Sequence, residues 1–357
     1  MSMRRLISLF AILSLVLAAC GSVDGGADAT TAPETGSDWD AVVEAAQAEG
    51  EAVWYGTEVE TWTEALKPLF LAETGVEFVA APRAATGAIL ERVSGEAAAG
   101  AVGGDVLLVA DFTVWIDHPE WFVDLDTAGL PNYAAYPENA KWNNKCAIVT
   151  QNPAGILYNT DLVDEEHIPE TWEDLLDPYW QGQMAFTDPR SSPTYNSYMF
   201  LLEENYGAEF LEGIGAQNPD LFDSASPAAE QVAAGAYLVS FPSHYANSSA
   251  VRASGAPLEL VIPPDPPTIG SVSCAGILAN SPNPNAAKVM MNYLLSAEAQ
   301  SAGCDAGVEN ASVLPNTTCL PLPPGWTAPP RDPETGQQIG QTDEEGRARI
   351  LDLLGIG

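Results

Sequence analysis

The chain has 357 residues, of which 46% are hydrophobic and 17% are charged. This length exceeds what one compact core usually supports, so we expect two domains or lobes. Asp and Glu number 49 against 13 Lys and Arg, a formal net charge of -36 at pH 7. A surface this negative repels phosphate backbones, which excludes general nucleic-acid binding. The apolar fraction is typical of a globular protein rather than a disordered one.

The N-terminus has the pattern of a signal peptide. Arg4 and Arg5 precede an uncharged apolar run at residues 6–19, which is shorter than the roughly 20 residues that span a membrane. Cys20 and Gly21 follow Leu-Ala-Ala, the pattern that bacterial lipoproteins place around the cysteine to be acylated. We therefore expect residues 1–19 to be removed and Cys20 to carry the acyl chains that hold the protein at the membrane surface. An ordinary secretory signal with a chance cysteine is the alternative.

Residues 20–37 are rich in Gly, Ala, Thr, Ser and Asp. Such a stretch buries too little apolar surface to order itself, so it predicts a flexible tether. The globular body would then begin near residue 38, outside the cytoplasm.

The body is predicted to alternate helices and strands. Trp39, Val42, Val43 and Ala46 have helical spacing, and Ser37 or Asp38 is the expected N-cap. Residues 105–109 form a continuous apolar strand, as in a parallel sheet covered on both faces. The alternation predicts an α/β fold. Helices are expected at 38–50, 61–73, 84–99, 171–176, 193–205, 228–234, from 284 onward and at 344–354, and strands at 52–55, 76–80, 154–158, 183–186, 237–241 and 272–279, with a proline-dense connector at 321–333.

Four cysteines remain in the mature body, and an even number in an oxidising compartment predicts disulfides. Three pairings are possible. We favour Cys304–Cys319, a disulfide that would close a short proline-containing loop and contribute about 3 kcal/mol to stability. Cys146–Cys274 would then be the other pair. A zinc site is the alternative, although no CxxC spacing is present and the three histidines lie far from the cysteines in the sequence.

Polar residues follow several of the predicted strands. In an open α/β sheet, ligands bind beyond the carboxyl ends of the strands. Each residue alone could equally be structural, as a solvated carboxylate, a packed ring or a surface ion pair. The candidates for ligand binding are Tyr55, Thr57, Glu58, Arg83, Thr86, Asp111, His244 and Tyr245.

A further candidate is the helix start at residues 188–195. Ser192 is a natural N-cap and Pro193 fits the first helical position. Free N–H groups, the helix dipole and the side chains of Arg190, Ser191, Ser192 and Thr194 could converge on an anion. The alternative is plain capping, with Arg190 paired to a nearby carboxylate.

Several segments together resemble extracellular solute-binding proteins of ABC importers, in the group that includes the ferric-iron-binding periplasmic proteins. These segments span most of the mature body and are specific for the superfamily, but none determines the solute. They are VWYG at 53–56, FLAETGV at 70–76, GDVL at 104–107, GILYNT at 155–160, TWEDLLDPYWQG at 171–182, DPRSSPT at 188–194, PNAA at 284–287 and NYLLS at 292–296.

The resemblance implies a two-lobe fold of type II, with central mixed sheets and two hinge-crossing strands. The chain would cross near residues 152–158 and return near 270–276. These strands should be neighbours, which favours a Cys146–Cys274 bridge near the hinge. The implied lobes are residues 38–150 with 270–320, and residues 151–269 with 321–357.

Ferric-binding relatives often hold iron with a tyrosine pair, a histidine, a carboxylate and a synergistic anion. Here the tyrosine pair position has His244 and Tyr245, the histidine position is closest to Glu58, and the carboxylate position lies near Asp111. This set can bind a hard cation but departs from the family pattern. Arg83, Arg190 and the Ser191–Thr194 cap suit an anionic organic solute or phosphonate at least as well.

The resemblance therefore implies a monomeric lipoprotein, not an enzyme and without a cofactor, on the extracytoplasmic face of the membrane. It would deliver ferric iron or a small anion to an ABC permease. A tethered hydrolase is the first alternative, although the mature body has no HExxH, GxSxG or SxxK motif. An adhesion lipoprotein is the second.

Overall fold

The structure is a computed structural model that describes residues 35–84, 86–340 and 343–357. The predicted signal peptide, Cys20 and nearly all of the predicted tether lie outside the described residues. Within the described part of the chain, no helix is both long and apolar enough to cross a membrane.

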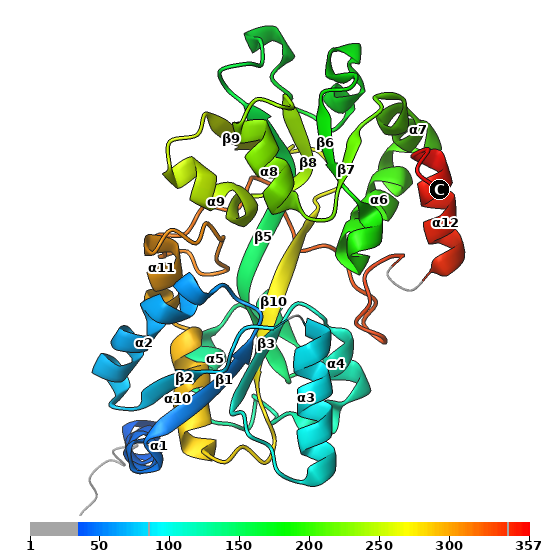
Figure 1. Cartoon of the computed structure of the whole chain (residues 1–357). Coiled ribbons are helices and arrows are strands. Elements are labelled where there is room, and N and C mark those ends of the chain that lie inside the picture. Colours follow the sequence, from blue (N-terminus) through cyan, green and yellow to red (C-terminus); the bar gives the residue numbers. More distant parts are fainter. Residues whose placement is uncertain (1–34, 85, 341–342) are drawn as a thin grey trace, which may run out of the picture. The chain divides into compact units, whose positions relative to one another are not determined.

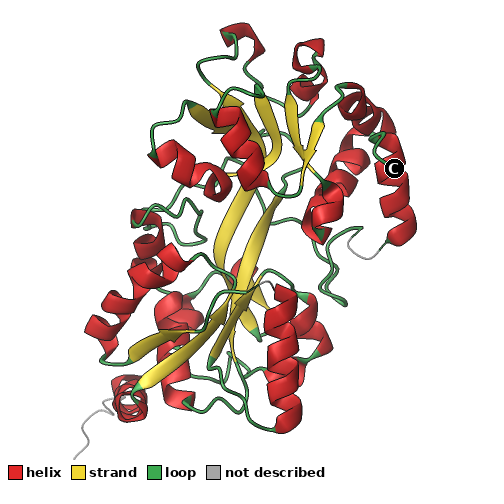
Figure 2. Cartoon of the chain, viewed as in Figure 1, coloured by secondary structure: helices red, strands yellow, loops and turns green. Residues whose placement is uncertain are grey.

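The first group of elements is built on a sheet whose middle strand is β1 (Glu51–Gly56). Its parallel neighbours are β2 (Glu77–Ala80) and β3 (Val106–Val109), and all four residues of β3 are buried. Helices lie to either side of these strands in Figures 1 and 2. They are α1 (Thr35–Glu49), α2 (Glu60–Thr74), α3 (Thr86–Ala99), α4 (Thr113–Asp117), α5 (Pro131–Ala135), α10 (Pro284–Leu294) and α11 (Ala297–Asp305).

The second group is built on β6 (Met184–Thr187), which lies between β7 (Asp220–Phe222) and β8 (Val239–His244), all parallel. Serine at position 192 caps the long helix that follows β6, as expected. The other elements of this group are α6 (Pro193–Tyr206), α7 (Ala208–Ala216), α8 (Ala225–Ala233), α9 (Tyr245–Ala253), β9 (Leu258–Val261) and α12 (Glu344–Leu353).

Two long antiparallel strands connect the groups. β5 (Cys146–Asn159) pairs with β10 (Gly270–Ile277) over its first half and with β8 and β9 over its second half, while β10 also pairs with β3. The expectation that the two crossing strands are neighbours is confirmed. We call this β5–β10 pair the hinge ribbon (Figure 1).

The apolar cores divide at the hinge ribbon. The first core takes its fully buried residues from positions 46–149 and 272–308, and also includes Trp326. The main core of the second group takes its residues from 154–241, with Ile269, Ile350 and Leu354. The predicted division into lobes remains a prediction.

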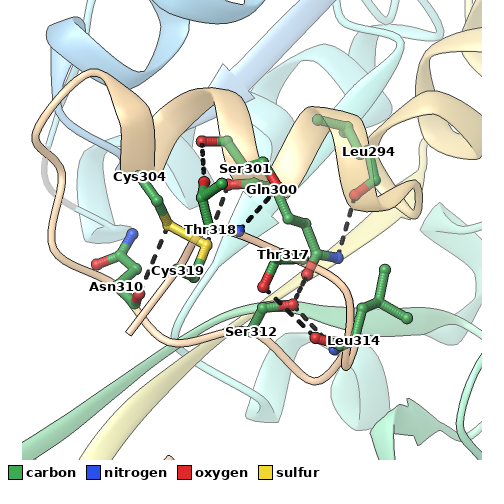
Figure 3. The surroundings of a disulfide bond; sticks show 10 residues. All are labelled: Leu294, Gln300, Ser301, Cys304, Asn310, Ser312, Leu314, Thr317, Thr318 and Cys319. Atoms are coloured by element: carbon green, nitrogen blue, oxygen red, sulfur yellow. Dashed lines mark hydrogen bonds between the residues drawn. A yellow bond between two sulfur atoms is a disulfide. The ribbon is translucent and has the colours of Figure 1, made fainter. Parts of the chain in front are cut away.

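Both predicted disulfides are present. Cys146–Cys274 joins the two strands of the hinge ribbon, and Cys304–Cys319 closes the loop after α11. Figure 3 shows the second disulfide between α11 and a chain segment held by Gln300 and Ser312. Ala311 of this loop exchanges both backbone hydrogen bonds with Gln151 of β5, so the disulfide secures the loop against the hinge ribbon.

Candidate functional site

The hinge ribbon has one polar face. Ser271 of β10 lies opposite Asn152 of β5, and Ser273 lies opposite Thr150. Because side chains two residues apart point to the same side of a strand, these four share a face. Thr150 and Ser273 are 3% and 6% exposed, and Oδ1 of Asn152 has no hydrogen-bond partner among the described residues. Buried polar groups usually have partners, so this face has unused hydrogen-bonding capacity.

The first group places a carboxylate on this face. Glu58, just after β1, accepts a hydrogen bond of 3.1 Å from Thr150 Oγ1. Burial raises the pKa of Glu58, while hydrogen bonds from Thr150 and Ser273 and the charge of Arg83 oppose the rise. Glu58 and the exposed Arg83 both line a pocket of about 480 Å³ at the ends of β1 and β2. Arg83 Nε donates to the Thr57 carbonyl at 2.8 Å, which holds the guanidinium at this edge.

The second group places a phenol and an imidazole beside the same face. Tyr198 of α6 donates to His244 Nε2 at 3.1 Å, and His244 Nδ1 lies 2.9 Å from Asn247 Oδ1. The amide oxygen accepts from Nδ1–H, so Nε2 is the acceptor for the phenol. Burial lowers the pKa of His244 to about 4, so the imidazole is neutral at physiological pH.

Tyr198 also connects to the hinge ribbon. Burial raises the pKa of its phenol well above the ordinary value, and a hydrogen bond with Ser271 acts against this rise. Tyr195 lies one turn earlier on α6, with its ring 5.8 Å from that of Tyr198 and 6.2 Å from the imidazole of His244. Burial raises the pKa of Tyr195 to about 12. Both phenols are therefore neutral hydrogen-bonding groups.

Arg331 lies where β3 ends. Its guanidinium carbon is 4.0 Å from the ring centroid of Phe112, and Nη2 donates to the Ala110 carbonyl at 3.4 Å. Burial lowers the pKa of Arg331 to about 10, and electrostatic interactions with Asp111 and Tyr198 oppose this. The side chain therefore stays charged at neutral pH. Asp111 itself accepts hydrogen bonds of 3.0 and 2.9 Å from the backbone and hydroxyl of Thr113.

Two predicted site residues point elsewhere. Tyr55 is directed toward α3: its hydroxyl donates to Glu96 at 3.0 Å, and Arg92 lies 4.2 Å from its ring centroid. Its side chain packs on the helix face of the sheet, so it is left out of the site that we propose. Tyr245 begins α9 and packs beside β9, where its hydroxyl donates to the Leu260 carbonyl at 3.4 Å. Thr86 is the first residue of α3.

At the predicted helix start, residues 188–195, the structure shows helix capping, which was the alternative to anion binding. Arg190 donates from Nε and Nη2 to Asp188 at 2.7–2.9 Å, and from Nη1 to the Ile356 carbonyl at 3.2 Å. Ser191 Oγ donates to the Asp188 carbonyl, and Ser192 Oγ accepts from the backbone N–H of Thr194. These groups satisfy one another locally, and a solute-binding role for them remains a prediction.

The predicted metal ligands have separate partners. Glu58 bonds to Thr150, Asp111 to Thr113, and His244 to Tyr198 and Asn247. Among the residues that the structure describes, no three or more His, Cys, Asp or Glu side chains form a group that could hold a metal ion. The metal set of Glu58, Asp111, His244 and Tyr245 thus remains a prediction that this geometry does not support.

Sequence reasoning missed several residues of this site. The spacing of Tyr195 and Tyr198 places both rings on one face of α6, which is a usable signal. Polar residues also alternate with apolar ones at Ser271 and Ser273, a period-2 pattern typical of a strand with one polar face. No local sequence pattern identified Arg331 as a site residue, because it belongs to an irregular proline-rich segment.

Comparisons with known proteins agree with this fold. A family model described as bacterial extracellular solute-binding protein matches residues 118–320. An uncharacterized protein of Haemophilus influenzae is 29% identical over an alignment of 166 residues that covers 44% of this chain and 46% of that protein. The matched part therefore spans less than half the length of that relative.

Three solved structures are similar over most of the chain. Iron-bound HitA from Pseudomonas aeruginosa has a TM-score of 0.65 at 18% identity, covering 86% of this chain and 99% of that one. FutA from Trichodesmium, with iron and citrate, has a TM-score of 0.66 at 18% identity, covering 86% and 100%. AfuA from Actinobacillus pleuropneumoniae, with fructose-6-phosphate, has a TM-score of 0.61 at 20% identity, covering 86% and 99%. The likenesses confirm the predicted two-lobe type II fold.

Proposed function

Because this chain belongs to the bacterial extracellular solute-binding protein family, we propose that it captures a small solute outside the cytoplasm and delivers it to an ABC permease. Its predicted signal peptide and Cys20 support a protein tethered to the membrane by acyl chains. The solute would bind between the lobes, and lobe closure requires that the solute bind the closed state more tightly than the open one.

The polar face of the hinge ribbon carries this proposal. Thr150, Ser271 and Ser273 hydrogen-bond to groups from both sides of the ribbon, namely Glu58 and Tyr198. A small solute on this face would contact both groups of elements at once. Such contact gives a solute different affinities for the open and closed states.

We further propose that the solute is a small organic anion rather than ferric iron. The site offers neutral hydroxyl donors and the exposed guanidinium of Arg83, and charged donors form the stronger hydrogen bonds to anions. A hard cation prefers several anionic oxygen ligands. Among the neighbouring structures, AfuA is in complex with fructose-6-phosphate and FutA is in complex with iron and citrate.

Replacing Ser271 and Ser273 together with Ala is expected to weaken solute binding by about fivefold to a hundredfold. Each lost hydrogen bond is worth about 0.5–1.5 kcal/mol, and about 1.4 kcal/mol is a factor of ten. The measurement is the melting temperature of each protein with citrate, inorganic phosphate, fructose-6-phosphate or ferric chloride. A ligand at 100 times its Kd stabilises the folded protein by about 2.7 kcal/mol, which raises its melting temperature.

The matched control replaces Ser249 and Ser254 with Ala. Their hydroxyls donate to the carbonyls of Ala246 and Val251 in α9, and this variant should behave like the wild type. Stabilisation by ferric chloride alone would contradict the anionic solute. Equal binding by both double variants would show that the polar face of the hinge ribbon is not the site.

A further inference from the structure

Residues 321–340 form a segment that we call the C-terminal strap, which contacts both groups of elements. Near its start, Trp326 packs in the first core and donates from Nε1 to the Ile269 carbonyl at 3.1 Å. At its end, Asn196 of α6 donates to the Gly340 carbonyl at 2.9 Å. In Figure 1 the strap is the orange-red segment that passes beside α6 on its way to α12.

The middle of the strap is a small hairpin that packs directly on the chain after β3. Arg331 and Gln338 form an antiparallel bridge, and Asp332 bonds to Gln337 and Gly336 through the backbone. Gly336 has a φ of +70°, and a Cβ there would lie 2.6 Å from the Phe112 carbonyl oxygen. Only glycine allows both this conformation and this close approach. The hairpin therefore holds Arg331 in a defined place.

Arg331 has no ion-pair partner within the described residues. No carboxylate there lies within ion-pair distance of its guanidinium, although the charge of Asp111 acts on it from farther away. Its hydrogen bonds from Nη1 and Nη2 go to the carbonyls of Gly336 and Ala110. A guanidinium has five N–H donors, so donors remain for another acceptor. A partly buried charge is costly unless it is paired.

We propose that Arg331 is a solute-binding residue, carried by the C-terminal strap to the end of β3, where its guanidinium binds the acidic group of the solute. The proposal rests on the proposed function and specifies which residue of this chain recognises the anion. The guanidinium carbon lies 4.0 Å from the ring centroid of Phe112, and the remaining N–H donors would form a two-pronged contact with a carboxylate or phosphate. Arg331 lies beyond residues 118–320, so the family match does not assign this role.

The charges that act on this position leave room for an anion. Asp111 and the phenol of Tyr198 are the groups that influence Arg331. Thr113 already bonds to Asp111, and His244 accepts from Tyr198, which is protonated. The solute would form the direct ion pair that Arg331 lacks among the described residues. Because the strap also contacts α6, the same residue would connect solute binding to both sides of the hinge ribbon.

The test compares Arg331→Gln and Arg331→Lys with the wild type and with Arg349→Gln, a control on α12 whose arginine pairs with Glu203 at the surface. Titration calorimetry would use citrate, inorganic phosphate and fructose-6-phosphate as probes, with putrescine as a cationic comparison. We expect Arg331→Gln to bind the best anion at least tenfold more weakly and Arg331→Lys to be intermediate, because lysine keeps the charge but not the planar fork. The control should match the wild type.

The outcomes distinguish a failure of the role proposed for Arg331 from a failure of the proposed anionic solute. Unchanged anion affinity in both Arg331 variants would overturn the role of Arg331 and leave the anionic solute standing. If none of the anions binds the wild type, the anionic solute fails and this inference fails with it. If Arg331→Gln does not fold, Arg331→Lys decides, because lysine retains the charge and the stem over Phe112.

Discussion

Replacing both Cys146 and Cys274 with Ala is expected to lower the free energy of unfolding by about 5 kcal/mol. The disulfide joins residues 128 apart in the sequence, so it removes a large loop-closure entropy from the unfolded chain. A loop of roughly 100 residues already corresponds to about 4.7 kcal/mol in this treatment. Urea unfolding of the oxidised protein and the variant, followed by tryptophan fluorescence, measures the difference.

The matched control is Cys304→Ala with Cys319→Ala, which opens a loop with a separation of 15 residues. Its expected loss is smaller, about 3 kcal/mol. If the short-loop variant were the less stable of the two, loop closure would not be the main contribution of these bonds. The Cys146–Cys274 variant should also bind solute more weakly, because this disulfide holds together the two strands that carry the polar face.

Acidification is expected to lower the free energy of unfolding by about 3 kcal/mol through the protonation of His244 alone. Its pKa falls from an ordinary value of 6.5 to about 4 because the imidazole is buried, and each pKa unit corresponds to about 1.36 kcal/mol. The unfolded chain binds a proton more readily than the folded one between these values. The contribution is therefore complete above about pH 6.5 and is lost as the pH falls through about 4.

The measurement is the difference in unfolding free energy between pH 7.5 and pH 4 for the wild type and for His244→Gln. Many carboxylates titrate in the same range, so only the difference between the two proteins reports on His244. We expect the variant to lose about 3 kcal/mol less than the wild type. His118→Gln, at a half-exposed histidine stacked on Trp121, is the control and should keep the pH dependence of the wild type. Identical pH profiles of wild type and His244→Gln would contradict the assignment.

The elements that the sequence predicted well have strong local signals. β3 is a run of apolar residues, and α10 begins at Pro284 with apolar residues on one face. The first half of β5, β9 and helices α7 and α9 were not predicted. Partners far along the chain hold these elements in place, such as β5 for β9.

The proposed site includes some of the predicted residues. Glu58, Asp111 and Arg83 follow strands and His244 ends β8, and a strand end is visible in the sequence as an apolar run that stops. Tyr55 lies outside the site that we propose, because its side chain is directed toward α3. The sequence pattern gave no way to distinguish that sheet face from the edge where the strand ends. Arg190 was a candidate anion ligand, whereas the structure shows it bonded to Asp188, two residues away.

The sequence by itself determined the α/β class and the family resemblance, because each depends on local composition, periodicity or a short motif. It left three cysteine pairings possible, and the structure decided between them. Only the tertiary structure decided which polar residues meet. Glu58, Thr150, Tyr198, Ser273 and Arg331 come from five segments, and their proximity depends on the register of β5 against β10 and on the path of the strap. Register and path are set by packing between distant segments, which no local pattern encodes.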